Sequence, residues 1–213
     1  MLVRCPFQDA KQKFICIELY YEWKVPMPAQ LSFVNTSISG LRVVQRKPIK
    51  DDRGAFIRMF CAKEFKEIGL TKPIVQINRS VNRHKGMVRG LHFQYPPFAE
   101  TKIVSCLKGE IMDVVVDLRQ GSETFLHWHG EVLSDENERA LFIPEGFAHG
   151  FQTLGDDCEL LYLHTEYYSR EKEGALNVLD PRLNISWPLP IFELSQRDRD
   201  HPFMDEKFSG VNI

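Results

Sequence analysis

The chain has 213 residues, of which 43% are hydrophobic and 26% are charged, and its formal net charge is -2. This length and composition predict a soluble globular protein with a substantial core, built as one domain or one domain with an appendage. The small net charge argues against a general nucleic-acid binder but is compatible with a local basic pocket for a small phosphorylated ligand. No apolar run approaches the roughly 20 residues of a membrane span, so no membrane partner is expected.

The cysteines and the charges near the N-terminus bear on the cellular compartment. Five cysteines are scattered along the chain without C-x-x-C spacing. This usage is typical of free, mostly buried thiols in a reducing compartment. Charged residues interrupt the first twenty positions, so they lack the apolar core of a signal peptide. We therefore expect a cytoplasmic protein.

Residues 1–37 are predicted to form an N-terminal extension, followed by a single domain over residues 38–213. Within the extension, the aromatic and β-branched run 14–23 favours a strand, which the prolines after it end. The alternatives for this extension are an added edge strand, an arm that contacts a partner, or an addition upstream of a usual start at Met27.

The rest of the chain reads as short strands separated by turn residues. A strand is predicted over 41–46, a turn at D-D-R-G (51–54), one short helix over 61–70, and a strand over 73–78. Seven further strands are predicted over 87–94, 102–107, 111–118, 124–133, 140–144, 146–154 and 158–168. Many short strands without helical crossovers predict an all-β, antiparallel jelly roll. The polar tail from Asn177 is expected to be loop-like, either as plain surface or with its acidic residues folded back to the barrel mouth.

His92 is the first residue that suggests chemistry. Strand alternation places it on one face with Gln94, whereas Arg89 falls on the opposite face. Arg89 and His92 therefore reach one pocket only if Gly90 marks a bulge. A lone histidine in a strand is commonly a hydrogen-bonded structural residue, but the company of Arg89 and Lys102 favours a functional one.

Two further side chains are ambiguous between packing and function. Lys102 alternates with apolar residues, so it lies at the rim of a strand or points into a functional cavity. Tyr162 alternates with His164, and an inward Tyr–His pair is compatible with core packing or with a proton donor that lines a cavity.

A metal site is the less favoured alternative. His127-x-His129 and the P-x-G-x-x-H segment that ends at His149 imitate the two metal motifs of the cupin superfamily, whose imidazoles suit transition metals. However, no glutamate follows His129 at the usual spacing, too few residues separate the two motifs, and Glu138 stands where a glycine is expected. No metal is therefore expected.

Three ordered blocks carry a resemblance to a known family: R-G-L-H-F-Q (89–94), V-V-V-D-L-R-x-G-S-x-T-F (114–125) and I-P-E-G-F-A-H-G-F (143–151). The sequence resembles the dTDP-4-dehydrorhamnose 3,5-epimerases from about Phe33 to Pro202. The resemblance implies a metal-independent cupin-type double-stranded β-helix with short flanking helices, usually a homodimer that exchanges N-terminal strands. It implies no cofactor.

The reaction that the resemblance implies is inversion of C3, C5 or both in a nucleotide-diphosphate-linked 4-keto-6-deoxyhexose, such as dTDP-4-dehydro-6-deoxyglucose. Such sugars feed deoxysugar and lipopolysaccharide O-antigen pathways. The alternatives are a sugar-nucleotide 3,4-ketoisomerase, a metal-dependent cupin that uses His127, His129 and His149, and a non-catalytic sugar-nucleotide binder.

The resemblance also implies roles for individual residues. His92 matches the general base, Asp198 the aspartate that orients it, Tyr162 the general acid, and Lys102 the amine beside the enolate oxygen. The residues that match those holding the nucleotide sugar are Arg53, Gln76, Asn78, Arg89, His149, Glu173 and Tyr168, the last of which stacks on the nucleobase. The chemistry agrees with these roles, because a histidine with its ordinary pKa of about 6.5 suits a base near neutral pH and an ammonium group stabilises an enolate.

One position departs from the family pattern. The family's D-x-R-G-x-F-x-E places a glutamate where this chain has Arg58. That carboxylate resembles an acceptor for the N–H of thymine, whereas arginine only donates hydrogen bonds. The hypothesis is that Arg58 reads a base with an unprotonated ring nitrogen, as in a CDP-linked sugar. The alternative is that Arg58 points to solvent and another group reads thymine.

Overall fold

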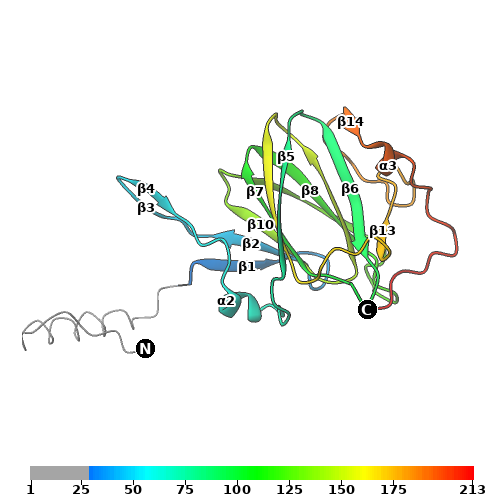
Figure 1. The fold of residues 1–213 in the computed structure, drawn as a ribbon, viewed down its shortest axis with the longest axis horizontal. Coiled ribbons are helices and arrows are strands. Elements are labelled where there is room, and N and C mark those ends of the chain that lie inside the picture. The colour runs from blue at the N-terminus through cyan, green and yellow to red at the C-terminus, as the bar shows by residue number, and fades with distance from the viewer. Residues whose placement is uncertain (1–28) are drawn as a thin grey trace, which may run out of the picture. The chain divides into compact units, whose positions relative to one another are not determined.

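The computed structural model describes residues 29–213, and one compact unit spans Leu31–Ile213 (Figure 1). The strand predicted over residues 14–23 lies outside the described residues. The unit begins before the predicted boundary at residue 38, because β1 (Leu31–Asn35) pairs along its whole length with β2 (Arg42–Arg46).

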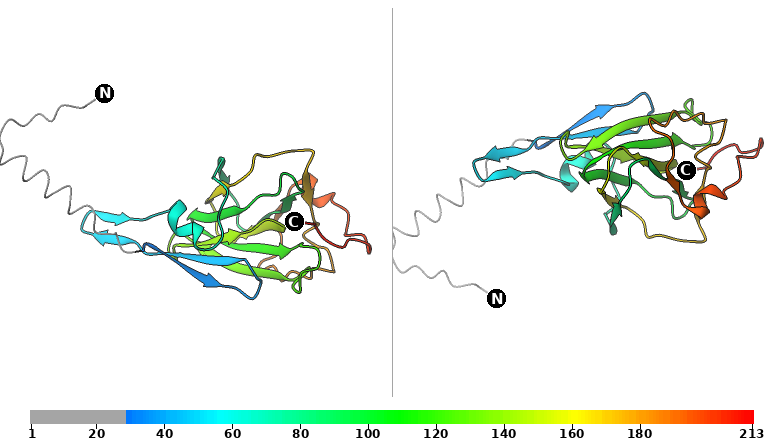
Figure 2. Two further views of the ribbon diagram at one scale, coloured as in Figure 1. Left: turned by 90° about the horizontal axis from the view of Figure 1, so that it is seen from below. Right: turned by 90° about the horizontal axis from the view of Figure 1, so that it is seen from above.

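Two sheets form the body of this unit (Figures 1 and 2), and both are antiparallel except for one short parallel strand at the C-terminal end, described below. The first sheet contains, in spatial order, β1, β2, β10 (Arg139–Ile143), β7 (Lys102–Lys108), β12 (Cys158–His164) and β5 (Gln76–Asn82). The second sheet contains, in spatial order, β13 (Glu173–Ala175), β6 (Met87–Gln94), β11 (Phe147–Thr153), β8 (Glu110–Asp117) and β9 (Trp128–Ser134). The predicted all-β jelly roll is confirmed.

Apolar residues fill the space between the two sheets and also cover their outer faces. On β8, Val115 belongs to the cluster between the sheets, while Val114 and Val116 belong to a second cluster under the C-terminal segment. The outer face of the first sheet is covered by α2 (Ala62–Lys66), whose Phe65 is fully buried. Both faces of β8 are buried at Val114–Val116, so apolar residues are consecutive there rather than alternating with polar ones.

A hairpin of β3 (Ile49–Asp51) and β4 (Gly54–Phe56) extends from the end of β2, and Figure 2 shows it projecting beyond the first sheet. All six of its strand residues are exposed. Its turn is the predicted D-D-R-G segment, and Gly54 has a φ of +133°. The hairpin is called the arm below.

Two strand starts differ from the predictions by more than one residue. β5 begins at Gln76 rather than at residue 73, and β9 begins at Trp128 rather than at residue 124. In the second case the buried Asp117 carboxylate accepts hydrogen bonds from Ser122 Oγ at 2.6 Å and Thr124 Oγ1 at 2.7 Å, which hold this segment as a turn.

The cysteines within residues 29–213 are free, and Cys106 and Cys158 are buried, whereas Cys61 is partly exposed. In the same range, the helices are all too short and too polar to cross a membrane.

The C-terminal segment folds back against β6. After β14 (Glu193–Leu194), which pairs in parallel with Met87 and Val88, the chain enters α3 (Gln196–Arg199). Ser195 caps α3, because its hydroxyl oxygen accepts the backbone N–H of Asp198 at 3.0 Å. The tail thus brings an acidic residue back to the barrel, which is one of the two alternatives predicted for it.

Candidate active site

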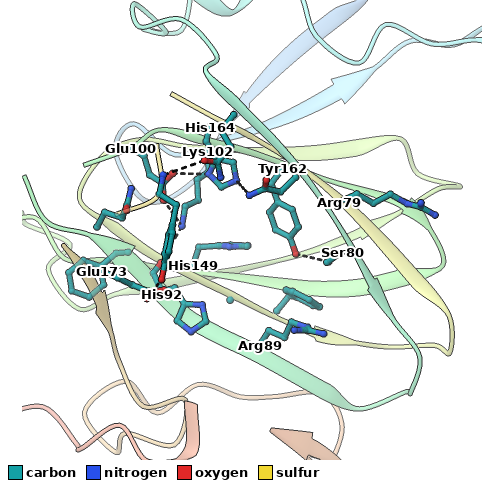
Figure 3. Close-up of a pocket in the computed structure, with 17 residues that line it drawn as sticks. Arg79, Ser80, Arg89, His92, Glu100, Lys102, His149, Tyr162, His164 and Glu173 are labelled. Carbon is teal, nitrogen blue, oxygen red and sulfur yellow. Dashed lines mark hydrogen bonds and ion pairs between the residues drawn. The ribbon is translucent and has the colours of Figure 1, made fainter. Parts of the chain in front are cut away.

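A pocket of about 690 Å³ lies between the two sheets (Figure 3). This volume is in the range that holds small-molecule ligands. Its lining includes most of the residues predicted for the site, namely Gln76, Asn78, Arg89, His92, Lys102, His149, Tyr162, Tyr168 and Glu173. Strands of both sheets contribute, so side chains meet in the pocket from opposite sides.

The side chain of His92 on β6 is hydrogen-bonded to Asp198 on α3, which does not itself line the pocket. Nε2 of His92 lies 2.7 Å from Oδ1 of Asp198, and the side chains are 31% and 4% exposed. Burial alone would raise the pKa of Asp198, but the hydrogen bond from His92 lowers it below its ordinary value. A carboxylate only accepts hydrogen bonds, so Nε2 of His92 donates to Asp198 and Nδ1 is the nitrogen left to accept a proton in the neutral ring.

A bulge at Gly90 brings Arg89 and His92 to the same pocket, as the sequence predicted. β6 pairs His92 with His149 and Arg89 with Phe151, so three steps on β6 oppose two on β11. Gly90 has a φ of +122°, and a Cβ there would lie 2.5 Å from the Cα of Gly150. Only glycine fits this conformation and this close approach.

Tyr162 faces the pocket from the first sheet, on β12, opposite the sheet that carries His92. Its hydroxyl lies 3.1 Å from Ser80 Oγ. Burial raises the pKa of the Tyr162 phenol well above its ordinary value. The phenol is therefore protonated at neutral pH and able to donate.

Lys102 opens β7 and points into the pocket rather than outward at the strand rim. Its Nζ lies 3.1 Å from Oε1 of Glu100 and 3.5 Å from the backbone oxygen of His92. The ammonium group is thus held close to the strand that carries His92 (Figure 3).

His149 on β11 has a buried partner on β8. Its Nε2 lies 3.0 Å from Oδ2 of Asp113, whose side chain is fully buried. Burial raises the pKa of Asp113. The charge of His149 and the hydrogen bond from His149 both oppose that rise. His149 also lies edge-on to Tyr162, with ring centroids 6.2 Å apart.

Arg89, Tyr168 and Glu173 complete the polar lining. Nε of Arg89 donates to Oδ1 of Asn82 at 2.8 Å. The hydroxyl of Tyr168, which is itself exposed, donates to Oε2 of Glu173 at 2.9 Å. Glu173 is also paired with Arg197 on α3.

Three predicted site residues do not line the pocket of their own chain: Asp198, which contacts His92 from outside it, and Arg53 and Arg58. Arg53 lies in the turn of the arm, where its side chain is 90% exposed and paired with Asp51. Arg58 follows the arm and forms an ion pair of 2.6 Å with Glu64. Arg58 is therefore neither in the pocket nor free in solvent.

The three histidines of the metal alternative have separate surroundings. His129 pairs with Glu131 at 3.3 Å, His149 bonds to Asp113, and His127 is exposed. Across residues 29–213, no three His, Cys, Asp or Glu side chains are grouped in a way that could hold a metal ion.

Sequence reasoning missed Ser80, Glu100 and Asp113, which each contact a predicted site residue. Glu100 stands two positions before Lys102, so strand alternation could have placed both on one face. Ser80 and Asp113 contact Tyr162 and His149 across neighbouring strands, and no short-range signal marks such pairs.

Comparisons with known proteins point in one direction. The sequence profile described as dTDP-4-dehydrorhamnose 3,5-epimerase matches residues 35–206. The chain is 42% identical over 175 residues to a dTDP-4-dehydrorhamnose 3,5-epimerase from Methanothermobacter thermautotrophicus, which covers 81% of this chain and 94% of that protein.

Solved structures agree with the sequence relatives. A 3,5-epimerase from Legionella pneumophila, crystallised with dTDP-4-keto-L-rhamnose, is 43% identical and has a TM-score of 0.75, covering 79% of this chain and 89% of that one. A 3'-monoepimerase from Streptomyces bikiniensis, in complex with dTDP-quinovose, is 34% identical and has a TM-score of 0.73, covering 79% of this chain and 85% of that one. The resemblance read from the sequence is confirmed, and the chain belongs to the dTDP-4-dehydrorhamnose 3,5-epimerase family.

Proposed function

We propose that this chain is an isomerase that inverts C3, C5 or both in a dTDP-linked 4-keto-6-deoxyhexose. The observation that carries the proposal is the His92–Asp198 pair on one side of the pocket, opposite the protonated phenol of Tyr162. A base and an acid on opposite faces of a sugar ring are what inversion of a carbon requires.

The proposed reaction proceeds in two proton transfers. Nδ1 of His92 takes the proton from the carbon beside the C4 ketone, and the electron pair of that C–H bond forms an enolate. The ammonium group of Lys102 stabilises the negative charge on the C4 oxygen. Tyr162 then donates its phenolic proton to the opposite face of the same carbon, which restores the ketone with inverted configuration. Solvent takes the proton from His92 and returns one to Tyr162.

Incubation with dTDP-4-keto-6-deoxyglucose, followed by NMR, tests this proposal. The expected result is a product inverted at C3, at C5, or at both carbons. Recovery of the sugar with both configurations unchanged, by protein that binds the nucleotide sugar, would contradict epimerisation and favour a non-catalytic binder.

The proposed nucleotide is dTDP, as in the names of the relatives. The CDP alternative rests on Arg58, which is paired with Glu64 outside its own pocket. A competition assay with equal concentrations of both 4-keto sugars separates the two. Preferential turnover of the dTDP sugar supports the proposal, and preferential turnover of the CDP sugar supports a base-reading role for Arg58.

We further propose a homodimer in which the arm of one subunit completes the pocket of the other. The arm is fully exposed, and its Arg53 reaches no pocket residue of its own chain. An exposed arm that carries a cation for a phosphorylated ligand is explained if a second copy receives it. Sedimentation analysis is expected to give a dimer.

A cytoplasmic location is also proposed. The free, buried thiols of Cys106 and Cys158 support it, because free cysteines are typical of reducing compartments. Cell fractionation is expected to recover the protein with the cytoplasmic marker.

A further inference from the structure

A series of polar contacts along the pocket wall connects residues on β5, β12, β7 and β6, and the residue Glu100 just before β7 (Figure 3). Nδ2 of Asn78 lies 3.4 Å from Nε2 of His164, and Nδ1 of His164 lies 2.7 Å from Oε2 of Glu100. Oε1 of Glu100 lies 3.1 Å from Nζ of Lys102, which in turn reaches the backbone oxygen of His92. Neither Glu100 nor His164 has a part in the reaction as described above.

The three central residues of this series of contacts are buried. The side chains of Glu100, Lys102 and His164 are 9%, 11% and 11% exposed. Burial alone would raise the pKa of Glu100, but the hydrogen bond from His164 and the charge of Lys102 lower it below its ordinary value. Glu100 is therefore a carboxylate that accepts from both neighbours.

The ionised carboxylate determines the tautomer of His164. Because Oε2 of Glu100 only accepts, Nδ1 of His164 donates to it. Nε2 then holds the lone pair and accepts from the amide of Asn78. Both ring nitrogens are occupied, so His164 is arranged to hold its neighbours in place rather than to exchange protons with a ligand.

We propose that Glu100 and His164 are positioning residues for the epimerisation, and that they act through Lys102 and Asn78. The proposal rests on the function proposed above. A lysine ammonium sits on a flexible four-carbon stem, and the carboxylate of Glu100 is its shortest polar contact. His164 orients that carboxylate and ties it to Asn78, a residue that lines the pocket on β5.

Removal of Glu100 has two opposing effects on the enolate. A negative charge near the ammonium is lost, which strengthens the field of the ammonium on the enolate oxygen. However, a buried ammonium without its carboxylate favours the neutral amine and is free to move. We expect the second effect to prevail, because a neutral or displaced amine no longer stabilises the enolate at all.

Kinetics of Glu100→Gln test this proposal. We expect kcat to fall by about tenfold to a hundredfold, as misplacement by about 1 Å can produce, with KM changed less than about threefold. The alkaline limb of the pH–kcat profile is expected to move to lower pH, which loss of a purely structural contact would not cause. Glu131→Gln is the matched control, because Glu131 pairs with His129 outside the pocket. Its replacement is expected to leave kcat, KM and the pH–kcat profile unchanged.

Unchanged or increased kcat in Glu100→Gln, or a fall without a shift of the alkaline limb, would overturn the proposal. His164→Asn is expected to lower kcat in the same direction, and the double variant is expected to be less impaired than the product of the two single effects. Independent, multiplicative effects would contradict a connected arrangement.

A measurement without substrate keeps this inference separate from the proposed function. Long-range ¹⁵N–¹H NMR of the assigned His164 ring is expected to show the proton on Nδ1 in the native protein. A proton on Nε2 alone would overturn the arrangement even if the enzyme is active. If the native protein does not epimerise the sugar, the proposed function is wrong. The His164 tautomer still shows independently whether His164 contacts Glu100 and Asn78 as described.

Discussion

His92 and Asp198 are 106 positions apart in the chain, and their side chains meet at 2.7 Å. The imidazole is partly exposed to the pocket, whereas the carboxylate is almost completely buried behind it. The carboxylate therefore fixes the orientation and the tautomer of the ring without access to the ligand itself. This division is consistent with the proposed roles, His92 as the proton acceptor and Asp198 as its positioning residue.

Replacement of Asp198 tests that division. Asp198→Asn removes the charge that favours an Nε2 proton and a protonated ring, so kcat is expected to fall by about 10²- to 10⁴-fold. KM is expected to change little, because Asp198 does not line the pocket. Asp200→Asn, an exposed neighbour at the end of the same helix, is the control and is expected to retain native rates. Equal rates for Asp198→Asn and its control would contradict the assigned role.

Replacement of Tyr162 separates proton abstraction from inversion. Tyr162→Phe keeps the base but removes the donor on the opposite face, so formation of inverted product is expected to fall by about 10²- to 10⁴-fold. Exchange of the abstracted hydrogen with solvent is expected to persist, because His92 still removes it and returns it to the same face. The matched control is Tyr167→Phe, which changes an exposed phenol next to the pocket residue Tyr168. Full inversion by Tyr162→Phe would assign the donor to another group.

Replacement of Asp117 tests the contribution of the hydrogen-bonded turn that precedes β9. Burial alone would raise the pKa of Asp117, but hydrogen bonds from Arg119, Ser122 and Thr124 lower it from 3.8 to about 2. A folded-state pKa below the unfolded value stabilises the fold at neutral pH, and this stabilisation is lost as the pH falls from about 4 to about 2. Asp117→Asn is expected to lower the free energy of unfolding by about 2 kcal/mol at neutral pH.

Urea unfolding at several pH values checks this prediction. The difference between native protein and Asp117→Asn is expected to shrink as the pH falls from about 4 to about 2, because the unfolded chain binds a proton at Asp117 near pH 4 whereas the folded protein binds it only near pH 2. Asp135→Asn, an exposed position, controls for the loss of one negative charge. A difference that does not depend on pH would contradict the contribution of the ionised carboxylate.

Mixing of two impaired subunits tests the proposed exchange of arms. Arg53→Ala is expected to be impaired through the arm, and His92→Gln through the pocket. In a mixed dimer that shares arms, one site carries both defects and the other carries neither. Random mixing at equal amounts is therefore expected to restore about a quarter of native activity.

The control for this experiment mixes His92→Gln with the double variant Arg53→Ala, His92→Gln, which leaves every pocket without its base. This mixture is expected to stay inactive. If the first mixture shows no more activity than its components alone, Arg53 does not act on the pocket of a second subunit.

The fold was largely readable from the sequence, because alternation and turn residues act locally. β6 spans the predicted residues 87–94, and the bulge expected at Gly90 is present. The start of β9 was predicted too early, because side chains after Asp117 hold the preceding segment as a turn. Strand propensity alone does not weigh such hydrogen bonds against sheet pairing.

The site could be predicted only in part from the sequence. A residue pattern shows on which face of a strand a side chain lies, but not which residues of other elements lie next to it. Strand alternation drew attention to His92, Lys102 and Tyr162. Only the family resemblance brought in Asp198, because its place depends on the parallel pairing of β14 with β6. Glu100 was within reach of the pattern and was overlooked.

Deuterium exchange distinguishes proton transfer on two faces of the sugar, through an enolate, from any other route to inversion. The sugar nucleotide is incubated in D₂O with native protein, His92→Gln or Tyr162→Phe, and NMR follows C3 and C5. We expect deuterium and inverted configuration with native protein, deuterium with retained configuration for Tyr162→Phe, and neither for His92→Gln. Inversion by native protein without deuterium at the inverted carbon would contradict proton transfer through an enolate.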